Sequence, residues 1–278
     1  MTDLTGKRLK HYYVESKVNE GGMGEVYKAI DKNLNRKVAI KVINQKLDDK
    51  NSIERFKQEA YMASQLDHHN ICTIIEIDQN DDGFYYIVMI WNDGQSLSEI
   101  IKNKNLTIND SVSYMRQCFL GLSAAHKKGI LHLDIKPANL MVNSEGNLKI
   151  VDFGLSRLDR ELPAFELEEF YGTAAYMSPE QSLGKQVDNR SDIWSAGVVL
   201  YECLTGEVPF KGDYEEAIMY SIINEEPVKP RLINPDIPEF LENIVLKCIE
   251  KDPDKRYPCC EEVIKDIDSY LSGDYLKK

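Results

Sequence analysis

The stretch ILHLDIKPANLMV, residues 130–142, decides how this chain is interpreted. Its polar residues His132, Asp134, Lys136 and Asn139 are set into an otherwise apolar run. An acid, a base and an amide at this spacing need a chemical reason. Leu133, directly before the acid, needs one as well.

Composition limits the classes of protein that fit. The chain has 278 residues, 42% of them hydrophobic and 29% charged, which is typical of a soluble globular protein with a substantial core. The formal net charge of −12 argues against nucleic acid as a general partner, because phosphate backbones are bound by clustered Lys and Arg. Oligomeric state is not readable from the sequence.

The cysteines and the apolar stretches bear on the compartment. The six cysteines show no Cys-x-x-Cys pair and no Cys/His ligand spacing, so free thiols are favoured over a zinc site. A strained redox pair of Cys259 and Cys260 is the alternative. No leader opens the chain, and no apolar stretch reaches the roughly 20 residues of a membrane span. We therefore expect a cytoplasmic location, with a membrane-anchored parent protein left open.

The first ninety residues are rich in short segments of Val, Ile and Tyr separated by Gly, Asn and Asp, which predict strands. These segments are YYVESKV (12–18), GEVYKAI (24–30), KVAIKVI (37–43), ICTIIEI (71–77) and FYYIVMI (84–90). Between the third and the fourth, residues 52–66 place apolar side chains on a single face and predict a helix.

Beyond IWNDG at residues 90–94 the pattern changes to helical periods. The clearest helix starts at Thr107, whose spacing to Asp110 is typical of a capping box. Residues 130–151 have strand character, with a hairpin around Gly146. A small strand-rich lobe before a larger helical lobe indicates a cleft, where ligands commonly bind. Further helices are predicted at 191–205, 213–224, 236–250 and 260–271.

Two features of the strand-rich part have a possible chemical role. VNEGGMGEVYKAI, residues 18–30, places three glycines between two strands, so its backbone could aim N–H groups at anionic oxygens, although such a hairpin is more often only a turn. Lys41 ends the strand VAIK in an apolar setting, where an ammonium needs a partner, and Glu59 is the candidate. Two unrelated surface charges are the plainer interpretation of that pair.

Asp152, in VDFGLS, adds a second carboxylate at a strand end. Mg²⁺ prefers oxygen ligands and bridges phosphates, so Asn139 and Asp152 would suit it. Asp134 is then free to accept the proton of an attacking hydroxyl. Lys136 could place positive charge near the transferred group.

With these residues in place, the chain resembles the eukaryotic-like protein kinases, and bacterial serine/threonine kinases in particular, over about residues 12–271. The shared elements follow family order: the loop ending GMGEV, VAIK, the helix glutamate, HLDIKPAN, DFG, GTAAYMSPE, DIWSAG and DPDKRY. The resemblance implies an α+β fold of the two-lobed kinase type, as one domain over residues 1–278. The N-lobe, about 1–90, would be a small antiparallel sheet with one main helix. The hinge would lie at about 90–94, and a larger, mainly helical C-lobe at about 95–275.

The resemblance also implies the activity: transfer of the γ-phosphate of ATP, with Mg²⁺, to Ser or Thr hydroxyls of proteins, including the kinase itself. Lys136 and Thr173 match the Ser/Thr branch of the family. Asp134 would be the catalytic base. Lys41, paired with Glu59, would hold phosphates, and Met89 would gate the nucleotide pocket. The implied nucleotide-binding residues are Asn19, Glu20, Gly21, Gly22, Gly24, Val26, Ala39, Lys41, Met89, Ile90, Trp91, Asn92, Asn139 and Asp152; the last two would bind the metal.

Three further residues match structural roles in the family. Glu180 and Arg256 match an ion pair that braces the substrate-side loop, and Asp192 matches the acid that supports the catalytic loop.

Two positions depart from the family pattern. Asn19 stands where the first loop glycine is usual; Asn tolerates left-handed backbone, so we expect weaker nucleotide binding at most. Leu133 stands where the family commonly has an Arg that pairs with a phosphorylated activation-loop residue. The loop itself is acidic, and from Leu155 to Gly172 its hydroxyl side chains are Ser156 and Tyr171. We therefore expect activity that does not depend on loop phosphorylation. The alternative is that Leu133 fills an apolar gap and that Arg157 or another base takes over regulation.

Two rival functions remain. A pseudokinase scaffold usually lacks a Lys, base or metal ligand, whereas Lys41, Glu59, Asp134, Asn139 and Asp152 are all present. A small-molecule kinase is disfavoured because Thr173 and YMSPE resemble a peptide-binding ledge.

Overall fold

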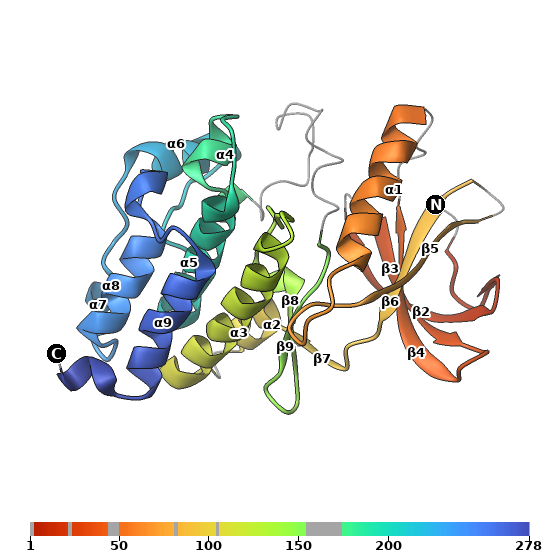
Figure 1. The fold of residues 1–278 in the computed structure, drawn as a ribbon, viewed down its shortest axis with the longest axis horizontal. Helices are drawn as coiled ribbons and strands as arrows, with labels where there is room; N and C mark the ends of the chain where they lie inside the picture. Colours follow the sequence, from red (N-terminus) through yellow and green to blue (C-terminus); the bar gives the residue numbers. More distant parts are fainter. Residues whose placement is uncertain are drawn as a thin grey trace. The chain divides into compact units, whose positions relative to one another are not determined.

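The computed structural model describes residues 3–21, 24–43, 50–80, 83–103, 106–153 and 174–277, which form two compact units (Figure 1). The described residues up to Asp67, together with Cys72–Asp93, form the first unit. His68–Ile71 and the described residues from Gly94 onward form the second.

The first unit is built on a six-stranded antiparallel sheet with strand order β1-β2-β3-β4-β6-β5. Its central strand β4 is buried at almost every position, as its run of apolar residues requires. Helix α1 (Lys50–Ser64) packs near β5, with the Phe56 ring 5.3 Å from that of Tyr85 on β6. The strands are β1 (Arg8–Leu9), β2 (Tyr12–Gly21), β3 (Gly24–Asp31), β4 (Arg36–Ile43), β5 (Ile74–Gln79) and β6 (Tyr85–Ile90).

One face of this sheet carries a closed hydrophobic core. Successive strand residues point to opposite faces, so Tyr27, Ile40 and Val88 fall on the same side of adjacent strands. Leu4 and Leu9 of the N-terminal segment belong to the same buried cluster. Burying each such side chain contributes about 2 kcal/mol, so this face holds the sheet together. The opposite face is left for other roles.

The predicted strand at 71–77 was wrong at its start. Residue Ile71 forms an isolated bridge with Ile150 in the second unit, and its N–H donates to His68. Because those partners hold Ile71, β5 begins only at Ile74. The other predicted strands and the predicted helix of this unit are confirmed within a few residues at each end, except that β2 continues to Gly21.

The second unit consists mainly of helices around α5. Almost all of α5 is buried, as is typical of a helix surrounded by others, and it packs against α3, α7 and α8 (Figure 1). At Gly197 a Cβ would lie 2.5 Å from Cys248 Cβ, so only glycine lets α5 and α8 approach so closely. The helices are α2 (Leu97–Lys102), α3 (Ile108–His126), α4 (Pro179–Ser182), α5 (Asn189–Thr205), α6 (Glu215–Asn224), α7 (Pro230–Ile233), α8 (Glu239–Cys248) and α9 (Cys260–Leu271).

The described residues of the second unit also contain a three-stranded sheet and short 3₁₀ turns. The predicted hairpin around Gly146 is formed by β8 and β9. The strands are β7 (Gly94–Ser96), β8 (Leu140–Asn143) and β9 (Leu148–Ile150), and the turns are η1 (Pro137–Asn139), η4 (Ala174–Tyr176), η5 (Pro253–Lys255) and η6 (Asp274–Lys277).

The predicted helices of the second unit are confirmed within a few residues at each end, and so is the capping box of Thr107 and Asp110 at the start of α3. The strand character expected from residue 130 was wrong as far as Asn139. The N–H groups of His132 and Leu133 bond to a side chain rather than to a neighbouring strand, and residues 137–139 form the turn η1. None of the helices in the described ranges has both the length and the apolar character needed to cross a bilayer.

A buried ion pair joins α4 to the segment before α9. The two terminal guanidinium nitrogens of Arg256, Nη1 and Nη2, each donate to the Glu180 carboxylate at 2.7 Å, and Ser191 Oγ donates to it at 2.6 Å. Burial acts to raise the pKa of Glu180, but these hydrogen bonds and the Arg256 charge lower it to about 2. The carboxylate is therefore ionised at neutral pH, and the pair expected from the sequence is formed.

Removing one partner of this pair leaves the other charge buried without a counter-charge. We expect Arg256→Met to lower the free energy of unfolding by about 3–5 kcal/mol, measured by urea denaturation at pH 7. Arg190→Met is the matched control, because Arg190 pairs with Asp188 and Asp254, which are 49% and 86% exposed. The free energy of unfolding of Arg190→Met should fall by less than about 1 kcal/mol. Equal losses in the two variants would contradict this account of the pair.

Candidate active site

Three polar side chains of the stretch at 130–142 meet in the loop between α3 and β8. The Asn139 Nδ2 donates to Asp134 Oδ2 at 2.9 Å and to the Asp134 carbonyl at 2.8 Å. The Lys136 Nζ lies 3.1 Å from the same Oδ2. The turn η1, opened by Pro137, brings the amide back to the acid. The acid, the base and the amide of this stretch therefore form one cluster.

The fourth polar residue, His132, ties this loop to the segment that carries Asp152. Its Nδ1 accepts from the Asp134 N–H at 3.2 Å, so the ring proton sits on Nε2, which donates to the Val151 carbonyl at 3.0 Å. Its ring also meets Phe153 edge-on, with centroids 4.6 Å apart. His132 is fully buried. It thus links the backbone of Asp134 to the residue before Asp152.

Asp192 on α5 anchors this loop through hydrogen bonds to its backbone. Its carboxylate accepts from the N–H groups of His132 and Leu133 at 2.9 and 2.7 Å and is bonded to His126 Nε2 at 2.8 Å. Burial acts to raise the pKa of Asp192, but the His126 hydrogen bond and the neighbouring histidines lower it overall. A buried carboxylate with several donors remains an anion.

Two residues of the site have left-handed backbone, with φ of 63° at Leu133 and 64° at Asp152. This conformation costs a non-glycine residue roughly 1–2 kcal/mol, so it persists only where surrounding bonds impose it. At Leu133 they do: Asp192 holds the N–H, and Gln181 Nε2 donates to the carbonyl at 3.0 Å.

In the first unit, four predicted nucleotide-contacting residues share the sheet face opposite the closed core. In the strand register Val26 pairs with Lys41, and Ala39 pairs with Met89. Residues of one cross-strand pair, or two apart on one strand, point the same way. Lys41 is only 4% exposed, as expected for an ammonium set in an apolar strand, and Glu59 is half-buried on α1. Their pairing stays a prediction.

The glycine-rich hairpin begins and ends where the sequence indicates. Gly21 closes β2 and pairs with Gly24, the first residue of β3. With φ of 149°, Gly24 lies so near the Val42 carbonyl that any Cβ would collide with it. Nearby, Lys17 Nζ lies 3.0 Å from the Glu20 carboxylate and also bonds to Glu25. Asn19 lies on β2 opposite Val26.

The predicted hinge residues follow β6. The Ile90 N–H donates to the Thr73 carbonyl at 3.0 Å, and the Trp91 indole donates to Asp93 at 2.7 Å. The Asn92 amide lies 3.4 Å from the Cys72 sulfur. These contacts fix the chain segment at which the first unit ends.

Several predicted residues lie outside the described part of the chain. They are Gly22, Thr173 and the activation-loop residues Ser156, Arg157 and Tyr171.

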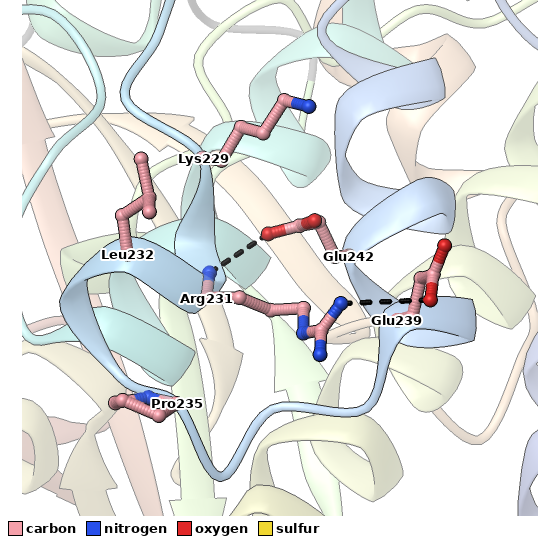
Figure 2. Close-up of a pocket in the computed structure, with 6 residues that line it drawn as sticks. All are labelled: Lys229, Arg231, Leu232, Pro235, Glu239 and Glu242. Atoms are coloured by element: carbon pink, nitrogen blue, oxygen red, sulfur yellow. Dashed lines mark hydrogen bonds and ion pairs between the residues drawn. The ribbon is translucent and has the colours of Figure 1, made fainter.

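A separate cavity of about 370 Å³ lies at α7 and α8 (Figure 2). The Arg231 N–H donates to Glu242 there at 2.8 Å, and the Arg231 side chain reaches Glu239. None of its lining residues was predicted as a site residue. The cavity therefore plays no part in the site described above.

The structure also brings in residues that sequence reasoning missed, namely His126 and Gln181. Both act through hydrogen bonds to the loop or its anchor. No spacing rule in a single sequence points to them, because their partners lie far away along the chain.

Residues 12–266 match the protein kinase domain family, so the chain belongs to the protein kinase family. Among curated relatives it is similar to the serine/threonine-protein kinase PrkC of Bacillus subtilis, with 37% identity over 99% of this chain and 43% of the relative. It is also similar to the serine/threonine-protein kinase PknB of Mycolicibacterium smegmatis, with 37% identity over 89% of this chain and 41% of the relative. The chain thus spans about two fifths of the length of these relatives.

The fold comparison agrees. The solved kinase domain of Mycobacterium tuberculosis PknI superposes with a TM-score of 0.75 at 23% identity, over 97% of this chain and 99% of that one. The resemblance and the fold class predicted from the sequence are confirmed.

The anchor at Asp192 can be tested by stability. In Asp192→Asn a single oxygen replaces two, so a buried N–H of His132 or Leu133 loses its acceptor, and we expect a loss of about 3 kcal/mol on urea denaturation. The control is Asp188→Asn, at the N-cap of the same helix. It keeps a capping oxygen and should cost less than about 1 kcal/mol. A loss no larger than that of the control would refute the anchoring role.

Proposed function

We propose that this chain is a protein serine/threonine kinase that transfers the γ-phosphate of ATP to Ser or Thr hydroxyls of proteins, including its own. One observation carries the proposal: in a chain of the protein kinase family, Asp134, Lys136 and Asn139 converge in one loop. The curated relatives named serine/threonine-protein kinases support the choice of acceptor.

In the proposed reaction, Asp134 orients the acceptor hydroxyl and accepts its proton as the hydroxyl oxygen attacks the γ-phosphorus. A bond forms between the hydroxyl oxygen and the γ-phosphorus. The bond between the γ-phosphorus and the oxygen that bridges the β- and γ-phosphates breaks, and ADP leaves with that oxygen. Lys136, bonded to the same carboxylate, supplies positive charge beside the transferred group. Lys41, partnered by Glu59, would hold the α- and β-phosphates.

The donors at this site fit Mg²⁺. Because Asn139 Nδ2 is used by Asp134, the amide oxygen remains for a cation, and Asp152 adds a carboxylate. Among the described residues no group of three or more His, Cys, Asp or Glu could hold a metal. A sparse pair of oxygens suits Mg²⁺, which keeps several waters and takes phosphate oxygens as its other ligands. Bound there, the ion would neutralise charge on the phosphates.

The nucleotide would contact the glycine-rich hairpin and the face of the first sheet opposite its hydrophobic core. We assign to it Asn19, Glu20, Gly21, Gly22, Gly24, Val26, Ala39 and Met89, with backbone groups of Ile90, Trp91 and Asn92 bonding adenine. The cross-strand pairing of Val26 with Lys41 and of Ala39 with Met89 supports this assignment.

We further propose one kinase domain with an N-lobe at about 1–90, a hinge at about 90–94 and a C-lobe at about 95–275. Its six free thiols and its use of ATP suit a reducing cytoplasmic location. The net charge of −12 favours protein substrates over nucleic acid.

The reaction can be tested by transfer of labelled γ-phosphate to a generic basic protein. We expect Asp134→Asn to lower the rate by a factor of 10² or more, and Lys41→Met to do the same. The control Glu145→Gln changes an exposed carboxylate of the β8–β9 hairpin and should leave the rate unchanged. Nucleotide binding by the unaltered chain without any transfer would favour the pseudokinase scaffold instead.

Regulation provides a second test. Leu133 is buried and has no charge for a loop phosphate to meet, and its N–H and carbonyl are already bonded. We expect phosphatase treatment, with phosphate removal confirmed by intact mass, to leave the rate within about twofold. A tenfold drop, equivalent to about 1.4 kcal/mol, would contradict this and favour regulation through another base such as Arg157.

A further inference from the structure

The peptide unit between Leu133 and Asp134 is bonded at both of its polar atoms. Its carbonyl accepts from Gln181 Nε2 at 3.0 Å, and its N–H donates to His132 Nδ1 at 3.2 Å. The preceding N–H, of Leu133, donates to Asp192. The plane of the peptide directly before the proposed base is therefore locked from two sides.

Gln181 is itself held in one orientation. It is the N3 residue of the capping box of α4: its Oε1 accepts from the Ser178 N–H at 3.0 Å, and its own N–H donates to Ser178 Oγ at 3.3 Å. With the amide oxygen used in this way, the amide nitrogen faces Leu133. A glutamate at this position could make the same capping bond but would turn an acceptor toward the carbonyl.

The segment that carries Gln181 is firmly placed. Its neighbour Glu180 forms the buried pair with Arg256, and Ser195 Oγ on α5 donates to the Tyr176 carbonyl at the start of the same segment. The bond from Gln181 thus connects a fixed support to a left-handed, strained residue. Releasing the carbonyl would let Leu133 relax and would rotate Asp134 away from Lys136 and Asn139.

We propose that Gln181 is a positioning residue for phosphate transfer, fixing the peptide plane before Asp134 and thereby the direction of its carboxylate. The inference rests on the proposed function of Asp134. The coupling between the α4 segment and the catalytic loop then runs through a hydrogen bond from the Gln181 side chain to the Leu133 backbone carbonyl, because the Leu133 side chain has no charge with which to form an ion pair.

The test uses two variants that separate positioning from capping. Gln181→Glu keeps the capping box and loses the donor to Leu133, whereas Ser178→Ala loses the capping oxygen and keeps the backbone N–H that orients Gln181. The kcat and the KM for ATP are measured for both variants and for the unaltered chain, from pH 5 to pH 8. Hydrogen–deuterium exchange of residues 130–142 is followed in parallel.

We expect Gln181→Glu to lower kcat by about 10- to 100-fold at pH 8 with KM for ATP within about twofold, since misplacing a reacting group affects mainly the chemical step. Its deficit should begin to shrink as the pH falls toward the ordinary glutamate pKa of about 4.3, because the protonated fraction of the carboxyl can again donate to the Leu133 carbonyl. Ser178→Ala should lower kcat by less than about threefold. Exchange in residues 130–142 should rise in Gln181→Glu alone.

A kcat of Gln181→Glu equal to that of the unaltered chain, or equal losses in the two variants, would overturn the proposal. Should the unaltered chain transfer no phosphate, the proposed function fails. Hydrogen–deuterium exchange then tests the positioning role alone. Exchange in residues 130–142 of Gln181→Glu equal to that of the unaltered chain would overturn it.

Discussion

The geometry of the candidate site depends on one buried carboxylate. Asp192 sits on the central helix α5, and its two oxygens take the N–H groups of His132 and Leu133 together with the ring of His126. A loop with no regular secondary structure has unpaired backbone donors, and burying them without an acceptor would be costly. The acid supplies that acceptor, so a buried loop of fixed conformation becomes possible at this position.

From that anchor the remaining contacts follow along the chain. The His132 ring bonds to the carbonyl of Val151, the residue before Asp152, and the Leu133 carbonyl accepts a hydrogen bond from Gln181. Asp134 lies between these fixed residues, and its carboxylate is met by Lys136 and Asn139. The left-handed conformation of Leu133 shows that its position is imposed by its bonds and not by local preference. Leu133 therefore has a structural use, packed and bonded at its backbone, that needs no charged side chain.

Much of this could be predicted from the sequence. Asp134, Lys136 and Asn139 share one short stretch, so their closeness follows from local chain geometry, and alternation along the strands predicts that Lys41 and Ala39 share a face. The segment from Ile130 was misjudged because apolar residues there indicate a strand, whereas their N–H groups bond to Asp192, some sixty residues away along the chain. Gln181 was missed for the same reason, and α4 and α7 are too short to show a helical period.

The most direct test of the central claim is the hydrogen exchange of individual backbone amides in the unaltered chain, measured by NMR. If Asp192 holds the loop as described, the His132 and Leu133 amides exchange only on global unfolding, at rates comparable to those of buried residues of α5. Exchange as fast as that of the amide of Ser144, an exposed residue of the β8–β9 turn, would show that the carboxylate does not hold this loop, and would contradict the account.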